Sequence, residues 1–235
     1  MSSQLSKPVD ILQNVPLSIV LVTCVASVSL VTTFWLGWAI WLIAILIVLA
    51  WLPVISMLIK AISRQSRYLG FFCILLITQG GHFIEHLAQL IQIYMLGFNP
   101  MHAHGLIGTL DIEWVHFIWN SWVLIYGVFL LYYSRKNPWL WALAVIALWH
   151  EAEHVYIIDC YLKTGMPGVP GLLAHGGALW GGLPISRPNL HFLYALVEEG
   201  LIILGYLRER RIAGLVNGAP TQIRRRKKQS LAESV

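Results

Sequence analysis

The sequence predicts an all-α integral membrane protein with six transmembrane helices. Of its 235 residues, 57% are hydrophobic and only 11% are charged, whereas soluble domains carry roughly 25% charged residues. The mean hydropathy of +0.69 points in the same direction. Apolar runs of about 20 residues, the length that crosses a bilayer, recur along the chain. Together these observations argue against a soluble globular domain.

Six apolar segments mark the predicted spans. They cover residues 15–35, 38–60, 69–97, 111–133, 138–162 and 188–208. The pair Asn99-Pro100 after Gly97 predicts the end of the third helix, and Asn137 followed by Pro138 predicts the start of the fifth. The first run is too long for the core of a cleavable signal peptide, so we expect a signal anchor.

The basic residues predict the orientation of the chain. Fourteen of the 16 Lys and Arg residues fall on one side of the predicted spans, and only Lys163 and Arg187 fall on the other. Because cytoplasmic loops carry the excess of Lys and Arg, we expect a cell-membrane protein with both termini in the cytoplasm. The loops at 98–110 and 163–188 then face outward. The basic run at 224–228 is expected to lie against anionic lipid, and no nucleic-acid partner is predicted.

A single membrane domain with three parts is expected. Residues 15–62 would form a two-helix N-terminal anchor, residues 68–208 a four-helix bundle, and residues 209–235 a basic cytoplasmic tail. No internal repeat is apparent. The three cysteines, Cys24, Cys73 and Cys160, are too few and too scattered for a disulfide framework or a cysteine metal motif.

Ionisable side chains lie where lipid-facing residues would be expected. Eight of the eleven acidic residues fall between residues 85 and 199, and a charge at mid-membrane costs about 2.5–3.5 kcal/mol. Helical spacing places polar residues of each of the last four spans on one face, and at about 1.5 Å per residue these faces meet about 8–16 Å below the outer helix ends. The inner halves of the same spans hold no ionisable side chain except tyrosines. We therefore predict one polar site in the outer half of the membrane, open outward and sealed from inside.

The spacing of the polar residues is typical of metal ligands. Both "HFIEH" at 82–86 and "HEAEH" at 150–154 place two histidines four residues apart, and the second matches the H-E-x-x-H motif, in which Glu is the base. We expect Glu151 and Glu153 to be catalytic. The predicted metal ligands are His82, Glu85, His86, Glu113, His116, His150, Glu151, His154, His191 and Glu198.

This set resembles the ligands of four-helix di-iron and di-manganese carboxylate proteins. There, two helices each supply a Glu and two others each supply a Glu-x-x-His pair. Here Glu113/His116 and Glu151/His154 are the pairs, and Glu85 and Glu198 are the single carboxylates. The order along the chain and the additional histidines differ from that pattern, so the resemblance is to a kind of site and names no family.

The ligand set predicts two divalent metal ions. Four carboxylates and six histidines exceed the needs of one tetrahedral zinc. Imidazole with carboxylate suits iron or zinc, with manganese as a further option, and the absence of thiolates argues against Cu(I). Nearby polar residues are expected to orient the ligands. These are Gln89, Asn120, Asp159 and Tyr194.

Three functions fit this site. The first is an oxidoreductase acting on a lipophilic small molecule or a quinol. The second is a zinc hydrolase of lipids or membrane peptides, with Glu151 or Glu153 deprotonating a metal-bound water. The third is a transporter of protons or metal ions through intramembrane Glu and His residues. Haem between paired histidines would leave the carboxylates unexplained. The histidines outside the spans, His102, His104 and His175, are expected to be ordinary loop residues.

Overall fold

The computed structural model describes the backbone of residues 15–232 and the side chains of residues 15–214. Lys7 and the basic run at 224–228, used above to predict orientation and lipid contact, lie outside the described side chains. The described chain contains helices and no strand, which confirms the all-α class. The elements are α1 (Leu17–Thr32), the 3-10 helix η2 (Thr33–Leu36), α2 (Ile40–Gln65), α3 (Arg67–Tyr94), the 3-10 helix η3 (Pro100–His102), α4 (Ile112–Tyr133), α5 (Pro138–Thr164) and α6 (Arg187–Ala232).

Five of the helices are long and apolar enough to cross a membrane, which indicates a membrane protein. The five are α1 with η2, α2, α3, α4 and the Arg187–Gly214 part of α6. The exception is α5, which is long enough but carries "HEAEH" in its apolar stretch. Its apolar residues are therefore diluted by the polar side chains that the site uses.

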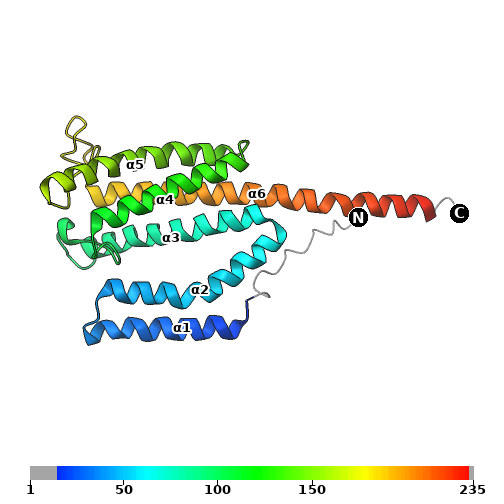
Figure 1. The fold of residues 1–235 in the computed structure, drawn as a ribbon, viewed down its shortest axis with the longest axis horizontal. Helices are drawn as coiled ribbons and strands as arrows, with labels where there is room; N and C mark the ends of the chain where they lie inside the picture. The colour runs from blue at the N-terminus through cyan, green and yellow to red at the C-terminus, as the bar shows by residue number, and fades with distance from the viewer. Residues whose placement is uncertain (1–14, 233–235) are drawn as a thin grey trace.

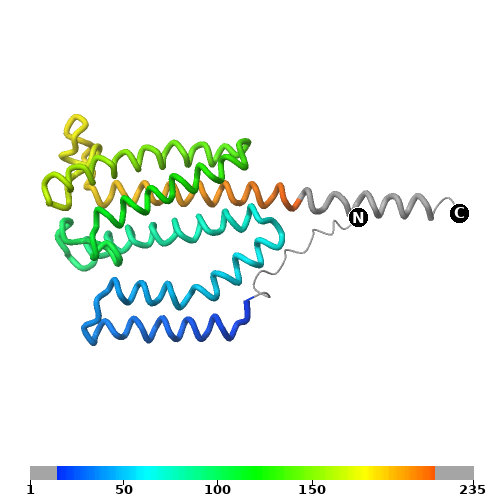
Figure 2. The backbone as a smooth tube through the Cα atoms, viewed as in Figure 1, coloured from blue at the N-terminus to red at the C-terminus, as the bar shows by residue number. Residues whose placement is uncertain are grey.

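The last four helices lie side by side (Figure 1). Contacts join α3 to α4 and α6, and α5 to α4 and α6. The hairpin of α1 and α2 lies beside them, with α2 against α3. The connections 95–111 and 165–186 lie at the same end of the molecule, and the α2–α3 and α4–α5 turns lie at the other, as the trace of the chain shows (Figure 2).

Side-chain caps set several helix starts. The Asn137 side chain accepts from the Trp139 amide with Pro138 in the first turn, so α5 begins where the sequence predicts. The carboxylate of Asp111 accepts from the amides of Glu113 and Trp114, which starts α4.

Two predicted helix ends are wrong. Helix α3 ends at Tyr94, before Gly97, because the Phe98 amide turns back to the Gln92 carbonyl and Gly97 takes a φ of +72°. Helix α6 continues past Arg208, since the Arg-rich sequence that follows contains good helix formers.

The end of the four helices away from the long loops has an apolar core. Its buried residues come from all four helices: Phe72, Leu75, Val123, Leu130, Leu131, Leu140, Leu143, Ala147 and Ile202. Aliphatic and aromatic side chains pack there at low cost, since none brings a polar group to satisfy. The buried histidine and glutamate side chains lie in the half nearer the long loops, whereas Asn137 is buried at the other end and donates to the Gly205 carbonyl.

Candidate metal centre

Six buried histidines meet between helices α3, α4, α5 and α6. They form two groups that could each hold a metal ion, triad A with His82, His86 and His116, and triad B with His150, His154 and His191. Within each triad, one ring nitrogen of every histidine lies within 4.8 Å of the others. Every ring is 3% exposed or less. Small side-chain rotations would therefore bring three nitrogens to one ion in each triad.

Hydrogen bonds fix the tautomer of four of the rings. The Nδ1 atoms of His82 and His86 lie 3.2 and 2.9 Å from the Oε1 atoms of Gln79 and Gln89. The corresponding distance is 2.7 Å from His116 to the Ile112 carbonyl and 3.0 Å from His150 to Glu198 Oε1. Each partner is an oxygen that accepts, so Nδ1 donates and the lone pair of each neutral ring is on Nε2. A partner that orients the ring from the far nitrogen is typical of metal-bound histidine.

The Nε2 atoms lack the partners that buried nitrogens need. Those of His116, His150, His154 and His191 have no hydrogen bond within the described part of the chain. The Nε2 atoms of His82 and His86 face each other at 3.1 Å. This distance is close to the spacing of about 3.3 Å between two nitrogen ligands of one tetrahedral zinc. Two lone pairs at this distance repel unless a proton or a metal ion lies between them, so the donor set fits a metal.

One chain of hydrogen bonds joins the two triads. Glu198 accepts from His150 Nδ1 through one carboxylate oxygen and from Gln79 Nε2, at 3.0 Å, through the other. The Gln79 amide is thereby oriented so that its oxygen accepts from His82. A single buried carboxylate thus contacts triad B directly and triad A through a neutral amide.

The carboxylates lie around the triads rather than within them. Glu85 Oε1 accepts from the amides of Leu106, Ile107 and Gly108 at 2.8–3.0 Å. Glu153 Oε1 accepts from the amides of Leu172 and Leu173 at 2.9 and 3.1 Å. Both residues were predicted to act at the metal, Glu85 as a ligand and Glu153 as a catalytic group. The structure instead has them hold the two long loops over the histidines.

The other predicted acidic residues also have protein partners. Glu113 forms an ion pair with Arg187, whose Nη1 donates to Glu113 Oε1 at 2.8 Å. Glu151 is half-buried and accepts from Ser121 at 2.7 Å, whereas Glu153 is fully buried. Positions 150, 153, 154 and 157 share the inner face of α5 and position 151 is rotated by about 100° from it.

Three of the four residues expected to orient the ligands contact a histidine of the triads. Gln89 orients His86, and Asn120 donates to the His116 carbonyl at 2.9 Å. The Tyr194 ring packs against His150, with ring centroids 4.7 Å apart. Asp159 is exposed and pairs with Lys163 instead. Gln79 and the bond between Arg187 and Glu113 were not predicted, because nothing local in the sequence links residues so distant along the chain.

The two triads are related by an internal repeat that the sequence analysis did not find. Each half of the site has a His-x-x-Glu-His helix, a Gly-Leu loop that binds its Glu, and a His-Phe pair on the next helix. The first copy is His82–His86, Gly105-Leu106 and His116-Phe117, and the second is His150–His154, Gly171-Leu172 and His191-Phe192. Loops of different length between these short matches hide the repeat from inspection.

The ring separations agree with this repeat. Ring-centroid separations in triad A are 4.7, 4.7 and 5.7 Å, and the corresponding pairs in triad B are separated by 5.0, 4.8 and 5.4 Å. Across the triads, the His86–His191 pair at 6.0 Å corresponds to the His154–His116 pair at 6.1 Å. The two halves therefore present two similar sites side by side.

Comparison with family models, curated proteins and solved structures finds no match for this chain.

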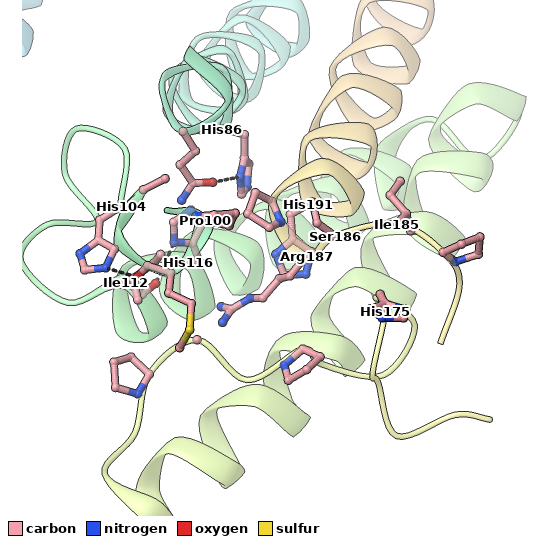
Figure 3. Close-up of a pocket in the computed structure, with 18 residues that line it drawn as sticks. His86, Pro100, His104, Ile112, His116, His175, Ile185, Ser186, Arg187 and His191 are labelled. Carbon is pink, nitrogen blue, oxygen red and sulfur yellow. Dashed lines mark hydrogen bonds between the residues drawn. The ribbon is translucent and has the colours of Figure 1, made fainter. Parts of the chain in front are cut away.

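A cavity of about 520 Å³ leads from the long loops to the histidines. His86, His116 and His191 line it, so it touches both triads, and Figure 3 shows their rings close together beside Arg187. The rest of the lining is largely proline and aliphatic side chains. His104 and His175 lie on opposite sides of the cavity, whereas His102 is not part of its lining.

Proposed function

We propose that this chain is a membrane metalloprotein with a dinuclear centre, each metal ion held by one histidine triad. The main support is the pair of Nε2 lone pairs facing each other at 3.1 Å in His82 and His86. Burial of four more imidazole nitrogens without hydrogen bonds would otherwise carry a desolvation cost with no return. Six imidazoles suit copper, iron or zinc better than manganese, which prefers oxygen ligands. Copper thus joins the metals expected from the sequence.

We further propose that the centre is that of an oxidoreductase acting on a lipophilic small molecule or a quinol. The zinc hydrolase expected from the sequence would use Glu151 or Glu153 to accept a proton beside the metal. The buried carboxylates Glu85, Glu113, Glu153 and Glu198 all accept hydrogen bonds from protein donors, and Glu151 reaches Ser121 on α4. The largely apolar cavity suits a lipophilic substrate such as a quinol, whose two electrons and two protons would pass to oxygen to give quinone and water.

A transporter has less support. The apolar core fills the described space between the four helices on the side away from the cavity. A proton or metal ion crossing there would meet mainly aliphatic and aromatic side chains, which do not replace its water.

The proposed membrane arrangement has six spans, with both termini in the cytoplasm of a cell-membrane protein. α5 would cross the membrane in addition to the other five helices, since its 27 residues are long enough. Residues 15–62 would be an anchor beside a four-helix bundle that opens outward. The basic tail at 209–235 would lie against anionic lipid.

Elemental analysis and oxygen consumption test the proposal together. The full chain, purified in detergent and returned to liposomes, should contain about two equivalents of iron or copper, since each triad offers three imidazoles. It should consume oxygen when given a short-chain quinol, and His82→Ala should lose about one metal equivalent and the activity. A protein that is fully folded with zinc alone, and consumes no oxygen, would contradict the redox assignment.

A further inference from the structure

We infer that the two triads are non-equivalent metal sites, with triad B the tighter site and triad A the weaker, exchangeable site that faces the cavity. This inference rests on the proposed metal binding. It goes further by assigning an order of filling and by naming Glu198 and Gln89 as the residues that set it.

The first observation is the charge behind each triad. In triad B, His150 donates directly to the carboxylate of Glu198 at 3.0 Å, and both side chains are 0% exposed. In triad A, the Nδ1 partners are two glutamine amides and the Ile112 carbonyl, which carry no net charge. A carboxylate on the far nitrogen raises the basicity of an imidazole ligand and strengthens its bond to the metal. Triad B should therefore bind a divalent ion more tightly.

The second observation is access. Two members of triad A, His86 and His116, line the cavity, but triad B contributes only His191. His150 and His154 are both fully buried and lie outside the cavity lining. An ion in triad A is therefore the one that an external ligand or a chelator reaches first. Burial and charge favour the same order.

The internal repeat makes this comparison direct. The two triads have nearly the same size and the same helix positions, so differences in ring spacing are small. The carboxylate of Glu198 has no counterpart in the first copy, where the position equivalent to it on α4 is Val123. The asymmetry thus comes from the residues behind the ligands rather than from the ligands themselves.

A cobalt titration of the full-length protein tests the inference. After the metal is removed with a chelator, Co²⁺ is added and its visible absorption is followed. Two binding events are expected, of which His154→Ala removes the tighter and His116→Ala the weaker. Glu198→Gln should weaken the tighter event by about 10–100-fold and the weaker event much less, because Glu198 reaches triad A only through the Gln79 amide. Glu199→Gln is the matched control, because this neighbouring carboxylate has no hydrogen bond to either triad within the described chain.

The reverse substitution, which adds a carboxylate behind triad A, tests the inference independently. Gln89 lines the cavity and orients His86, so Gln89→Glu would give triad A the carboxylate it lacks. This variant should raise the Co²⁺ affinity of the weaker event and so reduce the difference in affinity between the two events. Three results would overturn the inference. His116→Ala could remove the tighter event, the unmodified protein could bind both ions with equal affinity, or Glu198→Gln could weaken both events equally. Failure of the unmodified protein to bind Co²⁺ would instead contradict the dinuclear centre itself.

Discussion

The Nε2 atoms of His82 and His86 lie 3.1 Å apart, although a glutamine oxygen fixes the hydrogen of each ring on the opposite nitrogen. The four-residue spacing on α3 brings the rings together, and Gln79 and Gln89 fix their orientation. In a neutral pair this contact is repulsive, and a shared cation makes it attractive. The same spacing recurs at His150 and His154 on α5.

Removing one ligand should therefore lower the metal content of the protein. We expect His154→Ala to retain about one of two metal equivalents, because only triad B loses a donor. His175→Ala is the control, since this histidine lines the cavity but belongs to neither triad. Elemental analysis of the purified variants measures the effect, and equal losses in both would mean that the ligands were assigned wrongly.

Alanine substitution of the two glycines beside Glu85 and Glu153 should have the same effect on metal retention. Gly105 and Gly171 have φ values of +77° and +86°, and a Cβ would lie 2.4 and 2.7 Å from an oxygen of Glu85 and Glu153 respectively. Alanine at either position should detach a loop and reduce metal retention. Gly165→Ala separates the effect of backbone strain from that of the clash with a carboxylate, because Gly165 has a φ of +69° and open space around it. Only backbone strain, about 1–2 kcal/mol, should appear in its free energy of unfolding. Equal effects in all three variants would show that the contact with the carboxylate contributes nothing.

The histidines could be predicted from the sequence, and the positions of most carboxylates could not. Four-residue spacing within an apolar helix identifies His82, His86, His150 and His154 as one-sided pairs whatever the helix packs against. A buried Glu follows the same spacing whether it binds a metal or a backbone amide. The amides that Glu85 and Glu153 bind lie about 20 residues further along the chain, in irregular loops. That long-range choice decides between a ligand and a structural group, and it is set by loop conformation.

Glu151 illustrates a second limit. The H-E-x-x-H motif favours the residue directly after the first histidine, and Glu151 was therefore predicted to be both a metal ligand and a catalytic group. In the structure, triad geometry turns positions 150, 153 and 154 inward, which leaves Glu151 to accept from Ser121. A short motif match carries no information on which face of the helix packs against the neighbouring helices.

Arg187→Gln should strongly destabilise the protein. The partner of Arg187, Glu113, has a fully buried side chain, and the Arg187 side chain itself is only 12% exposed. Removing the guanidinium would leave a buried carboxylate without its counter-charge, which costs about 3–5 kcal/mol in comparable pairs. Denaturant unfolding in detergent measures the loss. Lys163→Gln breaks an exposed ion pair with Asp159 and should leave the unfolding free energy unchanged. A similarly small effect of Arg187→Gln would show that Glu113 is not held as an ion.

Single cysteines in the connections should report the proposed six-span topology. In a background without Cys24, Cys73 and Cys160, the exposed positions Thr109, Lys136 and Ala178 each precede or follow a helix whose crossing is in question. A membrane-impermeant maleimide added to intact cells should label Thr109→Cys and Ala178→Cys, because the basic α4–α5 turn is expected in the cytoplasm. Lys136→Cys should react only after the membrane is opened. The pair formed by Lys136 and Ala178 tests α5 alone, since only this helix lies between them. Labelling of both from the same side would place α5 on one side of the membrane, with its histidines and glutamates outside the lipid.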